Sequence, residues 1–149
     1  MPDTDSALTA GERRALRCVA ALMIPASTAH NVPGADDDMI FADIVNSLGR
    51  DTVLVKEAMH RLDSLAGRGF ADLSVSEQEA VAARLRAEGG APLAALNRAI
   101  PQCYYRDDRV MRALDMETRP PFPKGFEVEQ GDWSLLDPVR ARPKFYRPA

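Results

Sequence analysis

Residues 9–25 read TAGERRALRCVAALMIP, and this stretch is the clearest indication of the fold class. Thr9 followed by Glu12 is a capping box, in which the Thr9 hydroxyl accepts from the Glu12 backbone N–H and the Glu12 carboxylate bonds back to the cap. Pro25 ends the stretch, because proline cannot continue a helix. The apolar residues between them recur at helical spacing on one face: Ala15, Leu16, Val19, Leu22 and Met23. The sequence therefore predicts a first amphipathic helix.

Similar patterns follow along residues 26–117. Ser74 and Glu77 form a second capping box. Pro101 should kink or end a helix near Ile100, because its ring clashes with the preceding turn. No strand alternation and no internal repeat is evident, so the sequence predicts an all-α fold, a small bundle of about five or six helices. The further helices are expected at about 39–48, 51–66, 75–88, 93–100 and 107–114.

The end of the chain, residues 118–149, differs from this helical domain of residues 1–117. Its prolines break any continuous helix, and large apolar side chains stand between them, more than a solvated linker carries. We predict a long extended tail rich in proline and aromatic residues that lies on a protein surface, with Trp133 as the main anchor. That surface belongs either to the chain's own bundle or to another protein. The predicted partner-binding residues are Pro121, Phe122, Phe126, Trp133, Leu135, Leu136, Arg140, Arg142, Phe145, Tyr146 and Arg147.

Charge and hydropathy argue against two classes of partner, nucleic acid and the interior of a membrane. The formal net charge of the 149 residues is -3, whereas a nucleic-acid-binding domain usually carries a basic face. No apolar run reaches the roughly 18 residues of a membrane-spanning helix. Arg13 and Arg14 before an apolar run resemble a twin-arginine export signal, but Arg17 interrupts that run and Pro25 closes it without a small-residue cleavage pattern. We therefore expect neither nucleic acid nor a membrane span, and favour the helix over the signal.

The two cysteines, Cys18 and Cys103, lack the paired spacing of a zinc site. They are either reduced packing residues or one of them forms a disulfide, within the chain or to a partner subunit. The sequence favours the first interpretation, because free cysteine behaves as a small apolar residue.

The acidic run Asp36–Asp38 also admits two interpretations. A calcium loop requires alternating oxygen ligands and then a glycine, but Ile40 and Phe41 occupy the positions where a ligand and the glycine are needed. The alternative is that these carboxylates complement the dipole of the helix that follows. The sequence favours this alternative.

No pattern typical of catalysis appears in the sequence. His30 and His60 each lack a second histidine at i+4 that would build a metal-binding face. Tyr104 and Tyr105 are in principle proton donors, but tandem aromatics after a helix break favour a core edge or an interface. The glycines do not form a dinucleotide-binding fingerprint. We expect no catalytic residues, no metal site and no cofactor bound by this chain alone, with catalysis through Tyr104, Tyr105 or His60 as the least favoured alternative.

Several segments together resemble a known family. These are LTAGER at 8–13, LMIPA at 22–26, VPGAD at 32–36, FADLSVSEQ at 70–78, RPPFPKGFEVE at 119–129, GDWSLLDPVRAR at 131–142 and FYR at 145–147. The chain resembles the gluconate 2-dehydrogenase subunit 3 family over nearly its whole length, and the C-terminal segments carry the most specific part of the resemblance.

The resemblance implies a non-catalytic small subunit. In that family the partner is a large FAD-dependent subunit of the glucose-methanol-choline oxidoreductase type, which oxidises an alcohol or sugar hydroxyl, and a cytochrome sometimes accepts the electrons. Such a small subunit binds and stabilises the large one and may help it fold; a free-standing helical adaptor or assembly chaperone is the alternative. Family members often carry a twin-arginine signal, whereas this chain starts almost directly at its first helix with Met1-Pro2-Asp3. We therefore expect a cytoplasmic complex, or else a periplasmic one exported through a signal on the partner or one missing from this sequence.

Overall fold

A computed structural model of the chain describes residues 8–118 and 130–143. The chain divides into two compact units, Met1–Thr118 and Arg119–Ala149. We call the described part of the first unit, residues 8–118, the body and the described part of the second, residues 130–143, the tail segment. Each is described by itself.

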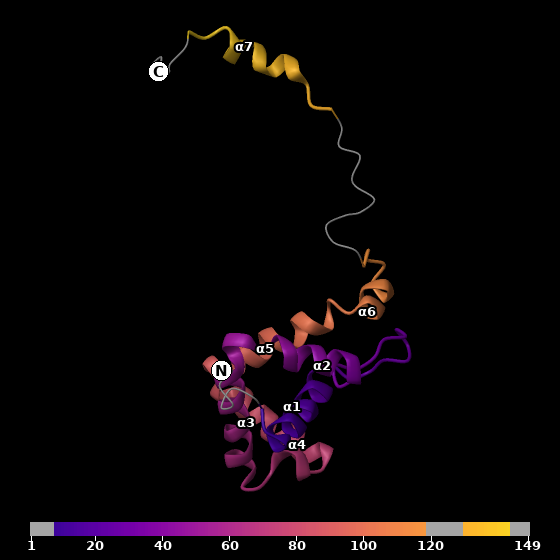
Figure 1. The fold of residues 1–149 in the computed structure, drawn as a ribbon, viewed down its shortest axis with the longest axis vertical. Coiled ribbons are helices and arrows are strands. Elements are labelled where there is room, and N and C mark those ends of the chain that lie inside the picture. The colour runs from indigo at the N-terminus through magenta and orange to yellow at the C-terminus, as the bar shows by residue number, and fades with distance from the viewer. Residues whose placement is uncertain (1–7, 119–129, 144–149) are drawn as a thin grey trace, which may run out of the picture. The chain divides into compact units, whose positions relative to one another are not determined.

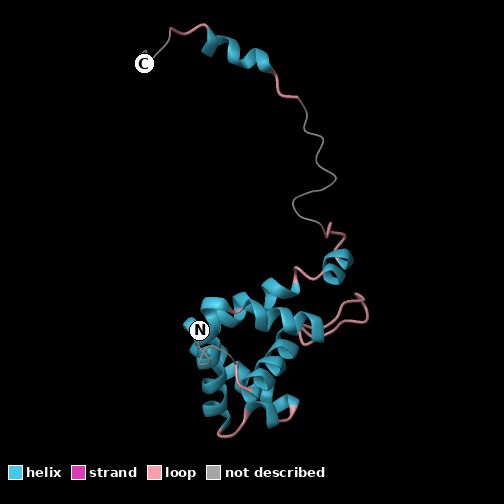
Figure 2. Ribbon diagram, viewed as in Figure 1, coloured by secondary structure: helices cyan, strands magenta, loops and turns pink. Residues whose placement is uncertain are grey.

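The body is built from helices and loops (Figure 2). Within the described residues there is no β-strand, only an isolated bridge between Ser27 and Val32. The all-α prediction is confirmed, and no helix in the described ranges is both long and apolar enough to cross a membrane. The helices of the body are α1 (Ala10–Met23), α2 (Asp38–Ser47), α3 (Thr52–Ala66), α4 (Val75–Glu88), α5 (Ala91–Tyr104) and α6 (Asp108–Ala113), with short 3₁₀ turns η1 (Gly49–Asp51) and η2 (Phe70–Asp72).

Both predicted capping boxes form. At the start of α1, the Glu12 backbone N–H donates to Thr9 Oγ1 over 3.2 Å and the Thr9 backbone N–H donates to Glu12 Oε2 over 2.7 Å. Ser74 and Glu77 make the same reciprocal pair at the start of α4. These contacts satisfy N–H groups that have no partner inside the helix.

The core of the body surrounds α3, which packs against α1, α4 and α5, while α2 packs against α5 (Figure 1). The apolar face predicted for α1 is buried at Ala15, Leu16 and Val19, so the apolar run after Arg13-Arg14 forms part of the core. The largest side chains with almost no exposed surface are Phe70, Leu16, Ile40, Ile44, Met59, Leu62, Leu96 and Ile100.

The fifth helix is longer than predicted. Pro101 lies inside α5, which continues to Tyr104 and is closed by a 2.9 Å hydrogen bond from the Tyr105 N–H to the Pro101 carbonyl. The expected end near Ile100 was therefore wrong. A proline inside a helix removes one hydrogen bond and costs about 3 kcal/mol, but Cys103 and Tyr104 beyond it are both buried. Burial of these two side chains offsets that cost, because tertiary packing overrides local propensity.

The tail segment contains a 3₁₀ turn, η3 (Trp133–Leu136), followed by one turn of α-helix, α7 (Asp137–Arg140). The expectation of an extended chain without helix is therefore corrected for residues 133–140. The reason is the position of Pro138, which stands in the first turn of α7. There its missing N–H has no helical partner to lose, so proline is tolerated.

Candidate interaction sites

The tail segment exposes its large apolar side chains. Trp133 is 59% exposed, Leu135 74%, Leu136 40% and Val139 58%, and none of residues 130–143 is buried. Asp132 holds the turn from its N-terminal end, because its Oδ1 accepts from the Ser134 N–H at 3.0 Å and from the Ser134 hydroxyl at 2.7 Å. These two bonds lower the pKa of Asp132. The segment thus has a fixed local shape without a core of its own.

Five of the predicted partner-binding residues fall within this segment and are exposed: Trp133, Leu135, Leu136, Arg140 and Arg142. Arg140 forms an ion pair with Asp137 at 3.5 Å. Val139 was missed by the sequence prediction, although its spacing of three and four residues from Leu136 and Leu135 would have revealed it once a helical turn was assumed. The other six predicted residues, Pro121, Phe122, Phe126, Phe145, Tyr146 and Arg147, lie outside the described residues.

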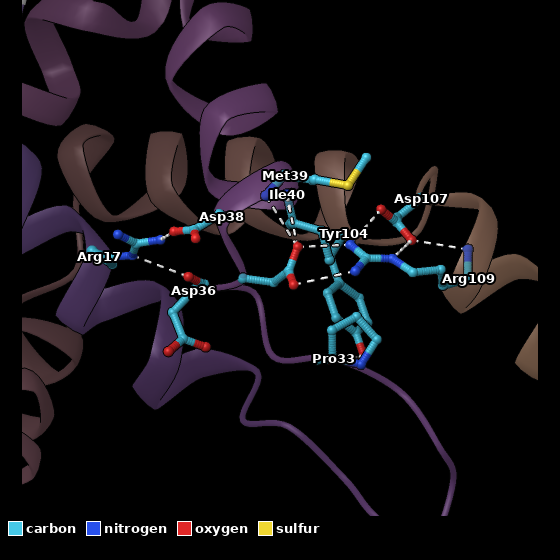
Figure 3. A network of polar contacts seen from close by, with 10 residues as sticks. Arg17, Pro33, Asp36, Asp38, Met39, Ile40, Tyr104, Asp107 and Arg109 are labelled. Carbon is cyan, nitrogen blue, oxygen red and sulfur yellow. Dashed lines mark hydrogen bonds and ion pairs between the residues drawn. The ribbon is translucent and has the colours of Figure 1, made fainter.

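A second candidate site in the body is a polar network centred on Arg109 at the start of α6 (Figure 3). Its guanidinium donates to both carboxylate oxygens of Asp37, from Nη2 at 2.7 Å and from Nη1 at 3.2 Å. It also donates to Asp107, with Nε–Oδ1 and Nη2–Oδ2 distances of 3.0 Å each. These hydrogen bonds lower the pKa of both carboxyls and raise the pKa of Arg109. One side chain thus links α6 to the start of α2.

Asp37 has two roles in this network. As the N-cap of α2 it accepts from the backbone N–H groups of Met39 at 3.1 Å and Ile40 at 3.4 Å, and it also binds Arg109. Close by, the Tyr104 hydroxyl donates to the Pro33 carbonyl at 3.1 Å and fixes the loop that precedes α2. Loop, α2, α5 and α6 therefore meet at one place.

The acidic run serves the start of α2. Asp38 forms an ion pair with Arg17, and the Arg17 Nε donates to the Asp36 carbonyl at 3.0 Å. The Arg17 guanidinium also lies 5.0 Å from the centroid of the Phe41 ring. In the described ranges no three His, Cys, Asp or Glu side chains are grouped as metal ligands would be. The geometry supports the interpretation in which these carboxylates cap and neutralise a helix terminus.

The residues considered for chemistry are distributed over the body. His60 is exposed, with its Nε2 3.1 Å from Glu12 Oε1, and the His30 N–H donates to the Ser27 hydroxyl. Tyr104 is buried and packs edge-to-face against the exposed Tyr105 at 5.2 Å between ring centroids, and burial raises the pKa of Tyr104. Tyr104 therefore acts as a structural donor to the loop. The described structure does not bring the two histidines, or a histidine and a tyrosine, into one hydrogen-bonded set.

Both cysteines are free thiols. Cys103 is 2% exposed, and burial raises its pKa, while Cys18 is partly exposed on α1. This geometry supports the packing interpretation within the described chain.

Two of the grooves on the surface of the body lie beside α6 and beside α4. One, of about 690 Å³, lies between the loop at residues 26–33 and the α6 residues Arg109, Arg112 and Ala113. The other, of about 500 Å³, lies among α1, α4 and α5; its walls are mainly apolar, with Glu79 and Arg86 on α4. Neither was predicted, because a groove depends on how helices pack and not on local spacing.

No protein-family model, no curated protein and no solved structure matches this chain.

Proposed function

We propose that this chain is a non-catalytic small subunit that binds and stabilises a larger protein through its C-terminal segment. The observation that carries the proposal is the row of exposed apolar side chains at Trp133, Leu135, Leu136 and Val139 on a turn with fixed shape and no core. Burial of apolar side chains of this size against another protein surface contributes a large favourable free energy of binding. Tryptophan in particular is enriched among the residues that dominate binding energy.

The flanking charges suit the same role. Asp137 and Arg140 lie beside the apolar side chains, are 69% and 64% exposed, and pair only loosely at 3.5 Å. Charged groups at the rim of an interface give orientation and partner selection more than affinity. We infer a partner surface with an apolar pocket and groups of both signs at its edge.

The resemblance to the gluconate 2-dehydrogenase subunit 3 family suggests the partner's chemistry. In this proposal the partner is a large FAD-dependent dehydrogenase or oxidase of the glucose-methanol-choline type, which holds the flavin and oxidises an alcohol or sugar hydroxyl. A cytochrome is the further component that such a complex would use to accept electrons.

The test is expression of that large subunit with and without this chain. We expect the large subunit alone to be insoluble or poor in flavin, and co-expression to yield a soluble hetero-oligomer with a flavin absorbance spectrum. A soluble, flavin-loaded and fully active large subunit made without this chain would overturn the proposal.

A free-standing adaptor or assembly chaperone is the second candidate. The observation that favours it is the complete core of the body, whose largest side chains have almost no exposed surface. Size-exclusion chromatography of the purified chain separates the two proposals. A stable monomer would favour the adaptor, whereas aggregation relieved only by the flavoprotein would favour the subunit.

A further inference from the structure

The last helix of the body, α6, is attached to the rest by few apolar contacts. Of its six residues only Val110 is buried, with 1% of its surface exposed. The turn from Tyr105 to Asp107 joins it to α5, closed by a 3.1 Å hydrogen bond from the Asp107 N–H to the Tyr104 carbonyl. Figure 1 shows α6 beyond the end of α5, at the edge of the body. Apolar burial therefore contributes little to holding α6 in place.

The main tie is instead the guanidinium of Arg109, which binds Asp37 on the α2 side and Asp107 on its own side. The Arg109 side chain is 39% exposed, so water and salt reach the tie. A single exposed ion pair contributes little to stability. An arginine that binds a carboxylate through two hydrogen bonds and also pairs with a second carboxylate contributes more. The free energy needed to open part of a native protein ranges from near zero up to the free energy of global unfolding. Elements with few buried contacts lie at the low end of this range.

Apolar groups lie next to α6. A groove of about 530 Å³ beside α6 is lined by Met39, Ile40 and Cys103, by the ion pair of Arg106 with Asp43, and by Asp107, Asp108, Arg109 and Arg112. Ile40 is 1% and Cys103 2% exposed, whereas Met39 is 70% exposed. Leu114 and Met116, which follow α6, are 52% and 54% exposed. Displacement of α6 would widen the access of solvent to Ile40 and Cys103 in this groove.

We propose that α6 is a hinged lid, which swings away from the body about the Tyr105–Asp107 turn while the other helices stay folded. The Arg109 tie to Asp37 keeps it closed. Opening uncovers Ile40, Cys103 and Val110 next to the point where the chain continues toward residue 119. This conformational step goes beyond the proposed subunit role, since it concerns only residues of the body.

Cys103 provides a native reporter of this opening, and the partly exposed Cys18 on α1 provides the internal reference. The experiment labels the full chain with N-ethylmaleimide under native conditions and follows each cysteine peptide by mass spectrometry. The key variant is Arg109→Gln. The matched control is Arg112→Gln, because Arg112 is on the same helix but its ion pair among the described residues is with Asp108, one turn away.

We expect Arg109→Gln to accelerate Cys103 labelling by about tenfold or more, the factor that corresponds to roughly 1.4 kcal/mol, with Cys18 labelling unchanged. Amide hydrogen exchange should rise over residues 106–118 and not over α1 or α3. The proposal would be overturned if the two variants changed the rate of Cys103 labelling equally, or if Cys103 and Cys18 were accelerated equally.

Should Arg109→Gln fail to fold, Asp37→Asn is the milder variant: it removes the charge that Arg109 binds, keeps a side chain that caps α2, and carries the same expectation. The wild-type chain gives an independent reading in about 1 M NaCl, where the Debye length falls to about 3 Å. There Cys103 should be labelled faster than in dilute salt while Cys18 is not. Salt-independent labelling of Cys103 would contradict an ionic tie.

Discussion

The body and the tail segment use the same kinds of residue in opposite ways. In the body, apolar side chains from α1 to α5 meet around α3 and lose nearly all their exposed surface, and no buried side-chain polar atom among the described residues lacks a partner. In the tail segment, tryptophan, leucine and valine stay exposed on a short helical turn. The comparison teaches that apolar composition alone does not decide whether a segment forms a core. A core also requires several elements that can bury their apolar side chains against one another.

The largest expected effect comes from removing a core side chain. Phe70 has no exposed surface, and its backbone N–H donates to Asp63 Oδ1 at 2.7 Å. Phe70→Ala should lower the free energy of unfolding by about 3 to 5 kcal/mol, since it removes buried surface and leaves a cavity. Urea denaturation of the full chain measures this. Val53→Ala, at a 73% exposed position on α3, is the control and should change stability by less than about 0.5 kcal/mol.

The next effect should appear in binding and not in stability. Trp133→Ala should leave the unfolding midpoint of the body unchanged, but weaken binding to the proposed flavoprotein partner by about 2 to 4 kcal/mol, as expected for an aromatic anchor at an interface. Co-expression of the large subunit with wild-type and variant chains in competition, and their ratio in the purified complex, checks the second part. If Trp133→Ala lowered the unfolding midpoint as a core substitution does, the contrast between the two regions would fail.

Acidification should act on the body through its ion-paired carboxylates. Hydrogen bonds from Arg109 lower the pKa of Asp37 and Asp107, and those from Arg106 lower the pKa of Asp43. A carboxyl with a lower pKa in the folded chain stabilises the fold above its unfolded pKa, near 3.9 for aspartate. That contribution is lost as the pH falls through the folded value. The unfolding temperature should therefore drop from about pH 4 downward.

Asp37→Asn tests the source of this acid sensitivity. Asparagine also caps helices well, so the variant keeps the start of α2 while it removes the charge that Arg109 binds. We expect a lower unfolding temperature at neutral pH and a smaller further drop on acidification. A drop as steep as in the wild type would assign the effect to other carboxyls.

The interactions that could be predicted from the sequence are mostly local. Thr9 with Glu12 and Ser74 with Glu77 are three residues apart, so the spacing alone shows that they can bond. The Arg109 tie joins residues 72 positions apart and the Tyr104–Pro33 bond joins residues 71 apart. No sequence spacing reveals such contacts, because they arise only after α2, α5 and α6 have packed.

Buried polar side chains illustrate the same limit. Gln78 is 7% exposed and its Nε2 donates to the Phe70 and Leu73 carbonyls at 3.3 Å each, which holds η2 against α4. In the sequence it is one polar residue of a solvent-facing pattern. The continuation of α5 through Pro101 was missed for a related reason. The sequence shows the cost of a proline inside a helix, but it does not show that residues beyond the proline are buried.

The smallest effect separates a helix cap inside the body from one in the tail segment. Thr9→Ala removes the hydroxyl that caps α1, and should lower the free energy of unfolding by about 0.5 to 2 kcal/mol, because α1 packs into the core and its fraying is coupled to the whole body. Asp132→Ala removes a comparable cap from η3, a turn that contains no buried residue. The unfolding midpoint of Asp132→Ala should stay at the wild-type value. Thermal denaturation of the two variants and the wild type measures this. Equal shifts in the two variants would show that the turn at residues 133–136 is coupled to the cooperative unfolding of the body, and the distinction between core and docking surface would have to be redrawn.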